Sequence, residues 1–138
     1  MSSKNYGLIL VPPSETDFIF GDNKLGDAPI NPSGQWDGWL PDYEPQSRPG
    51  AFDSYGCVSF TTLSAIEIME RKLFGATSNW SDRYLAKMSE TDKIRGNSPS
   101  VVAEILKSGG CVPEKDLPFD ITIDSFEKFY ATINSSLK

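Results

Sequence analysis

Cys57 follows Gly56 at the point where a proline-rich stretch ends and a long helical pattern begins. The first turn of a helix presents backbone N–H groups and the positive end of the helix dipole, and both favour a thiolate over a thiol. This position therefore predicts a Cys57 pKa below the value of about 8.5 that is usual for a free cysteine. The small residue before it leaves room for a carbonyl group to approach. The alternative is a structural thiol buried in the core, which is a common role for an unpaired cysteine.

The sequence contains no histidine. A histidine-ligated metal site, a histidine general base and a Ser-His-Asp triad therefore cannot be completed within these residues. Cys57 and Cys111 are the only cysteines, too few for a disulfide framework or a zinc site. Two cysteines are typical of a protein in a reducing compartment; the alternative is a single disulfide bridge between them. We expect no metal and no cofactor.

The net charge is −6, and the 13 Lys and Arg residues are scattered along the 138-residue chain. This distribution argues against nucleic acid or an acidic membrane surface as a partner. No apolar run approaches the roughly 18–20 residues of a membrane-spanning helix, and the first residues lack the pattern of a signal peptide. A cytoplasmic location fits these features. The length and the 38% content of hydrophobic residues indicate one folded domain.

The segment after Cys57 has helical periodicity. Its apolar positions are spaced by three or four residues, which predicts a helix that ends at Gly75 and buries one face. The expected buried face consists of Val58, Thr62, Ala65, Ile66, Met69, Leu73 and Phe74.

Three shorter helices are expected downstream. One begins after Ser81. Another has Ser98 as its N-cap and Pro99 at its first position, and it stops at Gly109-Gly110. A last helix is expected to begin at Asp124, with Glu127 as its capping-box partner.

The first 50 residues contain seven of the ten prolines and six of the eleven glycines. Residues 6–11 predict one short buried strand, which the following prolines end. We interpret residues 1–56 as an extended, irregular wrap packed on a helical part that covers residues 57–138, the two forming one domain. The aromatic residues expected to anchor this wrap in the core are Trp36, Trp39, Tyr43 and Phe52. The fold class is therefore mainly α with an irregular N-terminal wrap.

From Cys57 the sequence reads Cys-Val-Ser-Phe-Thr-Thr-Leu-Ser-Ala-Ile-Glu. It resembles a segment of the papain-like (family C1) cysteine peptidases, in which Cys-Trp-Ala-Phe-Ser opens a long central helix that carries Ile-Glu farther on. Other similar segments follow in the family's order and together span roughly residues 33–120. They are Gln35-Trp36-Asp37 through Gln46, residues 79–85, Gly96-Asn97-Ser98-Pro99 with the following helix and Gly109-Gly110, and residues 112–119.

This resemblance implies the fold of the family's left-hand domain, with the central helix of its α+β architecture beginning at Cys57. It implies that Cys57 is the nucleophile for hydrolysis of peptide bonds through a thioester acyl-enzyme. The Cys57 N–H and the Gln46 side chain would stabilise the oxyanion. Gly96, Asn97 and Ser98 would lie beside the extended backbone of a peptide or protein substrate.

Each of these roles has a simpler alternative. Gln46 can be a solvated loop residue, because it lies eleven residues before Cys57 and the family's spacing is shorter; an insertion at Arg48-Pro49-Gly50 would account for the difference. Ser98 can act purely as a helix cap. Cys111 stands where the family has an aliphatic residue, which predicts core packing.

The sequence departs from the family in three ways. Val58 replaces the family's Trp after the nucleophile, the cysteine pairs of the left-hand domain are missing, and the His and Asn of the second domain are absent. A thiol without an imidazole has no group to protonate the leaving amine.

Three interpretations remain open: half of a papain-like peptidase whose catalytic His lies on a second domain or chain; an inactive papain-like domain serving as a structural or binding component of a larger assembly, such as a phage or virion particle; or an unrelated helical domain with an incidental cysteine.

Overall fold

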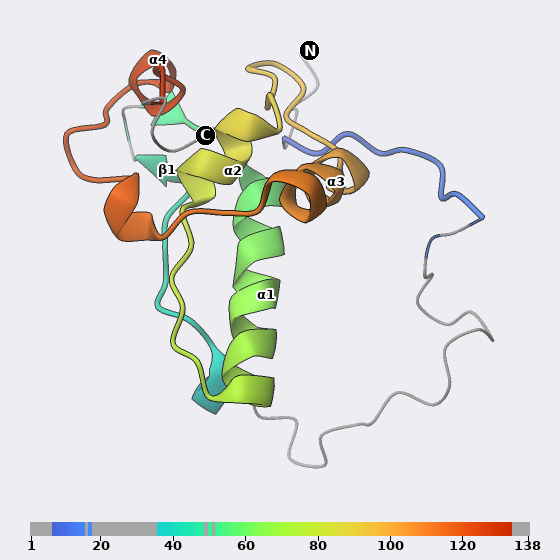
Figure 1. Cartoon of the computed structure of the whole chain (residues 1–138). Helices are drawn as coiled ribbons and strands as arrows, with labels where there is room; N and C mark the ends of the chain where they lie inside the picture. The colour runs from blue at the N-terminus through green and yellow to red at the C-terminus, as the bar shows by residue number, and fades with distance from the viewer. Residues whose placement is uncertain (1–6, 16, 18–35, 49, 51, 134–138) are drawn as a thin grey trace.

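The computed structural model describes residues 7–15, 17, 36–48, 50 and 52–133. These residues form a small, mainly helical domain with a two-stranded hairpin and a packed core of three helices (Figure 1). In chain order the elements are η1 (Asp37–Trp39), β1 (Ser47–Arg48), β2 (Phe52–Asp53), α1 (Cys57–Phe74), α2 (Asp82–Met88), α3 (Pro99–Gly109), η2 (Glu114–Asp116) and α4 (Phe126–Phe129).

Side-chain caps and glycines set the ends of the helices. The hydroxyl of Ser81 accepts from the backbone N–H of Tyr84 at the start of α2, and that of Ser98 accepts from Val101 at the start of α3. Gly75 ends α1 in the left-handed conformation, with φ of +67°. The predicted helix starts after Ser81 and Ser98, and the predicted stop at Gly75, are confirmed.

The core lies at the N-terminal end of α1, where α2 and α3 pack against it (Figure 1). Two adjoining clusters of buried side chains fill it. One contains Val58, Leu63, Leu85 and Val102, and the other contains Phe60, Ala86, Ile123 and Phe129. Phe52 and Phe119 pack against the second cluster, so the hairpin and the segment before α4 complete the domain.

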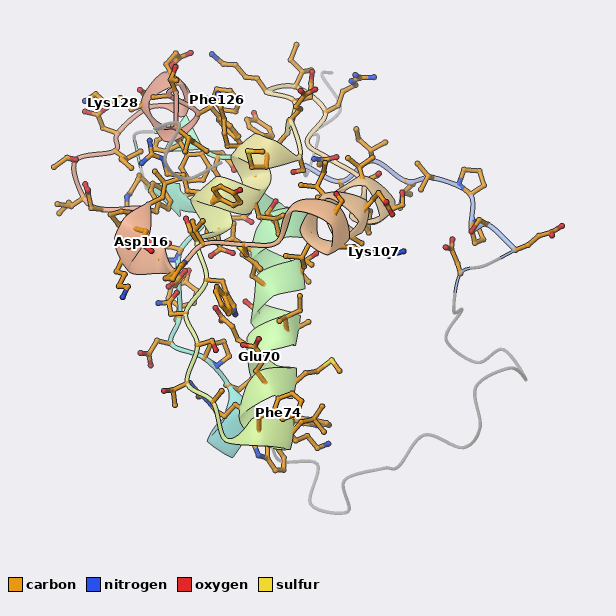
Figure 2. All side chains as sticks on the ribbon, in the orientation of Figure 1. Glu70, Phe74, Lys107, Asp116, Phe126 and Lys128 are labelled. Carbon is orange, nitrogen blue, oxygen red and sulfur yellow. The ribbon has the colours of Figure 1, made fainter. Side chains whose placement is uncertain are left out.

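Only the start of the predicted buried face of α1 is buried. Val58 is buried, and Thr62 and Ile66 are half-buried. Met69, Leu73 and Phe74 are 57–79% exposed because the second half of the helix extends beyond α2 and α3 (Figure 2). Ala65 is exposed as well. The side chains buried in their place include two polar ones, Ser59 and Glu67.

Two predictions about the N-terminal wrap are wrong. Residues 7–11 do not form a buried strand: Leu8 makes a single bridge with Asn97, and Leu10 is 84% exposed. Among the predicted anchors, Phe52 packs on the core, whereas Tyr43 is 89% exposed.

The tryptophan anchors also lie outside the core. Trp36 and Trp39 pack edge-on against each other, 5.5 Å apart, near the C-terminal end of α1. The ammonium group of Lys72 lies 4.5 Å from the centre of the Trp36 ring. They therefore form a surface cluster with the last turn of α1.

The last helix is a single turn, and its cap differs from the prediction. Ser125, not Asp124, is the N-cap, and its hydroxyl accepts from the backbone N–H of Lys128. Asp124 instead pairs with the Lys128 ammonium at 2.8 Å. Among the described residues, no helix is both long and apolar enough to cross a membrane.

Candidate functional site

Cys57 is the first residue of α1, and hydrogen bonds fix the loop that delivers it. The carboxylate of Asp53 accepts from the Tyr55 N–H at 2.8 Å, and the hydroxyl of Ser54 accepts from the Gly56 N–H at 3.2 Å. Tyr130, from beyond α4, donates its phenol hydrogen to the Ser54 carbonyl at 2.8 Å. Tyr55 adopts a φ of +55°, a strained value for a residue with a side chain. The loop is therefore held in one conformation that starts the helix at Cys57.

An extended segment of the same chain lies directly against Cys57. A methyl group added at Gly7 would meet Cys57 Sγ at 3.2 Å and the Tyr55 carbonyl oxygen at 3.1 Å. A methyl group at Gly96, whose φ is +76°, would lie 1.8 Å from the Gly7 carbonyl oxygen. Both positions therefore require glycine, because the backbones approach so closely.

The backbone of Asn97 holds this segment in place. The Asn97 N–H donates to the Gly7 carbonyl at 3.0 Å, and the Ile9 N–H donates to the Asn97 carbonyl at 2.7 Å. The pairing is parallel. Asn97 thus presents both backbone groups to an extended chain, the arrangement of an edge strand.

The buried Asn97 side chain orients that edge. Its amide nitrogen donates to the carbonyl of Ser89 at 2.8 Å and to the hydroxyl of Ser89 at 3.0 Å, while its oxygen accepts from the Ser98 N–H at 2.8 Å. Ser98 then caps α3. The Asn97 side chain is thus a positioning group, and Ser98 fixes the helix that follows.

A cavity of about 230 Å³ opens beside Cys57. Its lining is mostly apolar and comes from the N-terminal segment, α1 and the start of α3: Leu8, Cys57, Val58, Thr61, Thr62 and Pro99. An apolar side chain next to a peptide bond at Cys57 would fit this space.

The Cys57 thiol is half-buried, and the desolvation that follows raises its pKa above the ordinary value. Backbone hydrogen bonds from the first turn, chiefly from the Val58 N–H, lower the pKa but do not offset the burial, and the negative charge of Asp53 raises it further. The prediction of a lowered pKa is therefore wrong for this chain by itself. A thiolate here needs a neighbouring cation.

The hairpin brings Gln46 close to the loop before Cys57. Its carbonyl accepts from the Ser54 N–H at 3.3 Å, across a hairpin whose strands pair Ser47 with Asp53. The turn of this hairpin lies between Arg48 and Phe52. None of the hydrogen bonds described for this part of the chain joins the Gln46 side chain to Cys57, and its oxyanion role stays a prediction.

Cys111 lies against the core cluster of Val58, Leu63, Leu85 and Val102. Burial raises its pKa to about 12, and its Sγ lies 3.8 Å from the Ser81 carbonyl oxygen. This packed position is the one expected from the sequence. Neither Cys57 nor Cys111 forms a disulfide in the structure.

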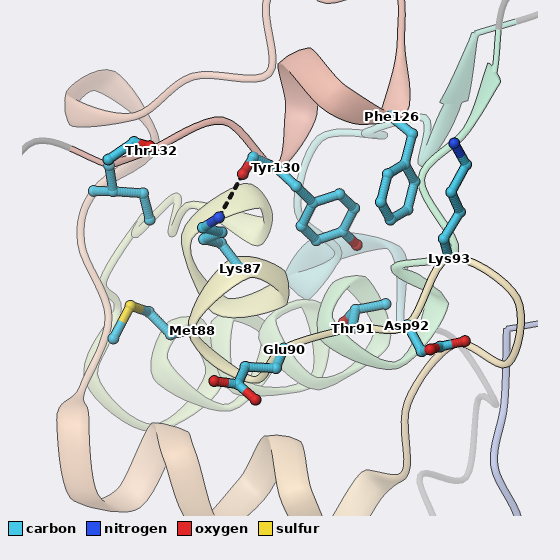
Figure 3. Close-up of a pocket in the computed structure, with 10 residues that line it drawn as sticks. Lys87, Met88, Glu90, Thr91, Asp92, Lys93, Phe126, Tyr130 and Thr132 are labelled. Atoms are coloured by element: carbon cyan, nitrogen blue, oxygen red, sulfur yellow. Dashed lines mark hydrogen bonds between the residues drawn. The ribbon is translucent and has the colours of Figure 1, made fainter.

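A larger cavity, of about 680 Å³, lies between α2, the loop that follows it and α4 (Figure 3). The ammonium group of Lys87 donates to the Tyr130 carbonyl, and that of Lys93 pairs with Glu127 at 2.7 Å. Because these two cations are engaged with protein groups, the cavity offers no evident anion site.

Sequence reasoning missed three contributors to the site: Gly7, Asp53 and Tyr130. The pair Asp53-Ser54, two residues before Tyr55-Gly56, is a local turn signal that was readable in the sequence. The contacts of Gly7 and Tyr130 join residues about 50 and 76 positions apart, for which no local pattern exists.

Within the described part of the chain, no group of three or more His, Cys, Asp or Glu residues could hold a metal ion. Comparison of the chain with protein-family models, with curated proteins and with solved structures gives no match.

Proposed function

We propose that this chain is the helical half of a papain-like cysteine peptidase, with Cys57 as the nucleophile. The observation that carries the proposal is the extended segment at the start of α1: residues 7–9 lie against Cys57 while hydrogen-bonded to Asn97. A peptide held on the same edge would place a backbone carbonyl next to the sulfur. The order of the segments that resemble the papain-like family supports the same assignment.

In the proposed reaction, Cys57 Sγ attacks the carbonyl carbon of a peptide bond. A C–S bond forms, the C–N bond breaks, and the thiol proton passes to the leaving amine. The first-turn N–H groups and the side chain of Gln46 would stabilise the negative oxygen. Water then hydrolyses the thioester.

The proton transfers in this scheme need a base that the chain does not contain. Because burial raises the Cys57 pKa, the scheme requires a second domain or chain that supplies an imidazole: an imidazolium beside the sulfur would lower that pKa and protonate the amine. The proposed substrate is therefore a peptide or protein, and the proposed partner is a second domain or chain that carries a histidine.

The experiment uses an ester that does not need an acid catalyst. A peptidyl p-nitrophenyl ester with an apolar side chain has a leaving group that departs without protonation, so the chain can be tested by itself. Mass spectrometry should show one acyl group on Cys57, added faster when free imidazole is present as a base. The Cys111→Ser control should be acylated equally, and Cys57→Ser should not. Equal acylation of Cys57→Ser, or none of the parent chain with imidazole, would contradict the proposal.

A second candidate is an inactive papain-like domain that serves as a structural or binding component of a larger assembly. The raised pKa of Cys57 and the chain segment that lies over it favour this alternative. It predicts that Cys57→Ser leaves assembly unchanged and that no acyl group is transferred under any buffer condition.

A further inference from the structure

Four carboxyl groups from four segments of the chain face one another where α2 begins. Glu44 precedes β1, Glu67 belongs to α1, Asp82 is the first residue of α2, and Glu114 opens η2. Asp82 is only 6% exposed and Glu67 only 8%. Carboxylates are rarely buried unless they are paired with a cation.

Three of these groups accept hydrogen bonds that hold them in place. Glu67 accepts from the Trp80 N–H at 2.8 Å, Glu44 from the side-chain amide of Asn79 at 2.9 Å, and Glu114 from the Phe119 N–H at 2.6 Å. The cluster therefore joins α1, the entry to α2 and the segment before β1.

The buried polar atoms of the cluster are incompletely satisfied. Asp82 Oδ1 and Glu114 Oε2 are buried and have no hydrogen-bond partner among the described residues. The Asp82 carboxyl lies within hydrogen-bonding reach of that of Glu44. Two ionised carboxylates can only accept, so this contact requires a proton on one of them.

Two arginines lie near the cluster, but their hydrogen bonds go to backbone carbonyls: Arg71 donates to Leu40, and Arg83 donates to Phe129 and Lys128. Their charges lower the pKa values of Glu67 and Glu114, respectively, without offsetting the effect of burial. Besides the four acids, the charged or titratable groups that interact with the cluster are Glu70 and Arg71 on α1, Arg83 on α2, and Cys111 between α3 and η2. The acids outnumber the two arginines.

We propose that the Asp82–Glu44 pair holds a proton that fastens the segment before β1 to α2, so that the domain is stabilised by acid and loosened as the pH rises. The ligand of this cluster is the proton itself. The proposal stands independently of any peptidase activity, because it uses none of the residues assigned to peptide cleavage.

The titration of the cluster supports the proposal. Burial and the neighbouring acids raise the pKa of Asp82 to about 9 and that of Glu114 to about 7, and burial raises the pKa of Glu67 as well.

The direction of the pH dependence follows from these shifts. In the unfolded chain, Asp and Glu lose their protons near pH 4, whereas the folded cluster keeps protons to a higher pH. The stabilisation is therefore complete below about pH 4 and is lost as the pH rises through the folded pKa values. Each proton taken up on folding changes the unfolding equilibrium constant by up to about tenfold per pH unit.

The test is urea unfolding of the full chain between pH 5 and pH 8, followed by circular dichroism. The unfolding constant of the parent chain should rise by about tenfold or more per pH unit in the lower half of this range. In Asp82→Asn, the amide can donate to Glu44 at any pH. The pH dependence of its unfolding constant should be weaker than that of the parent by about tenfold per pH unit, which corresponds to one proton. The variant should also be more stable than the parent at pH 8. The control is Asp116→Asn, an exposed acid on η2, which should keep the parent's slope.

A second variant covers the case in which Asp82→Asn does not fold. Glu44→Gln removes the other member of the pair and should reduce the slope by a similar amount. A pH-independent unfolding constant in the parent chain would overturn the proposal. A parent-like slope in whichever of the two variants folds would also overturn it.

Discussion

The two cysteines of this domain lie in different surroundings. Both side chains are half-buried, and burial raises the pKa of each thiol. Cys57 begins α1, where backbone N–H groups act to lower its pKa, and it lies beside a cavity and an extended chain segment. Cys111 packs against the apolar core, where the charges of Asp82 and Glu67 oppose its ionisation.

The difference lies in what surrounds each sulfur atom. At Cys57, backbone N–H groups act to lower the pKa and a cavity lies beside the sulfur. In the proposed reaction, a partner would supply the missing imidazole. At Cys111 the apolar contacts and the nearby acids act in the same direction, and ionisation would break core packing. The comparison therefore favours Cys57 over Cys111 as the thiol of the proposed reaction, and it is consistent with core packing of Cys111.

The largest expected effect breaks the contact over Cys57. Gly96→Ala would place a methyl group 1.8 Å from the Gly7 carbonyl, in a backbone conformation that favours glycine. We expect a loss of about 1–3 kcal/mol in unfolding free energy, together with faster alkylation of Cys57 as residues 7–9 are displaced. The rate at Cys111 should not change.

The matched control is Gly109→Ala, in the last turn of α3, where an added methyl group meets nothing within 4 Å. This variant should be neutral or slightly more stable, since alanine favours helix. Urea unfolding and site-resolved alkylation measure both variants. An unchanged Cys57 rate in a folded Gly96→Ala protein would show that residues 7–9 do not cover the thiol.

A smaller effect is expected at the cap of α3. Ser98→Ala removes the acceptor for the Val101 N–H and should cost about 1 kcal/mol of unfolding free energy. It should also loosen the Asn97 edge and raise Cys57 alkylation by less than Gly96→Ala does. Ser108→Ala, an exposed hydroxyl in the same helix, is the control and should change stability by less than about 0.5 kcal/mol. Equal losses of unfolding free energy in both variants would contradict the stabilising role of the Ser98 cap.

The smallest expected effect concerns the negative charge of Asp53 near Cys57. The charge of Asp53 raises the Cys57 pKa, so Asp53→Asn should lower it and shift the alkylation midpoint to a lower pH. The amide oxygen of Asn can still accept from the Tyr55 N–H, which preserves the loop. The pH profile of Cys111 should stay the same. A Cys57 midpoint that moves upward would contradict the assigned role of Asp53.

Much of the helical frame is readable from the sequence, because its signals are local. Ser81 and Ser98 precede their helices with capping hydroxyls, and Gly75 ends α1. Cys57 stands where the helical pattern begins. These features depend on residues within one turn of each other.

The errors come from interactions between distant segments. Periodicity predicts that α1 has an apolar face, but not that α2 and α3 cover only its first half, so the burial of Leu73 was predicted wrongly. The Cys57 pKa was mispredicted because the sequence does not show how deeply the sulfur is buried. The close approach of Gly7 and the hydrogen bond from Tyr130 likewise depend on the folded chain.

The most direct test of the central claim compares the two thiols in one sample. The full chain is treated with iodoacetamide at pH 8, and mass spectrometry follows Cys57 and Cys111 separately. Because a pKa of about 12 leaves very little of Cys111 as thiolate at this pH, Cys57 should react at least about tenfold faster. Equal rates, or faster reaction of Cys111, would contradict the assignment of an accessible nucleophile to the start of α1.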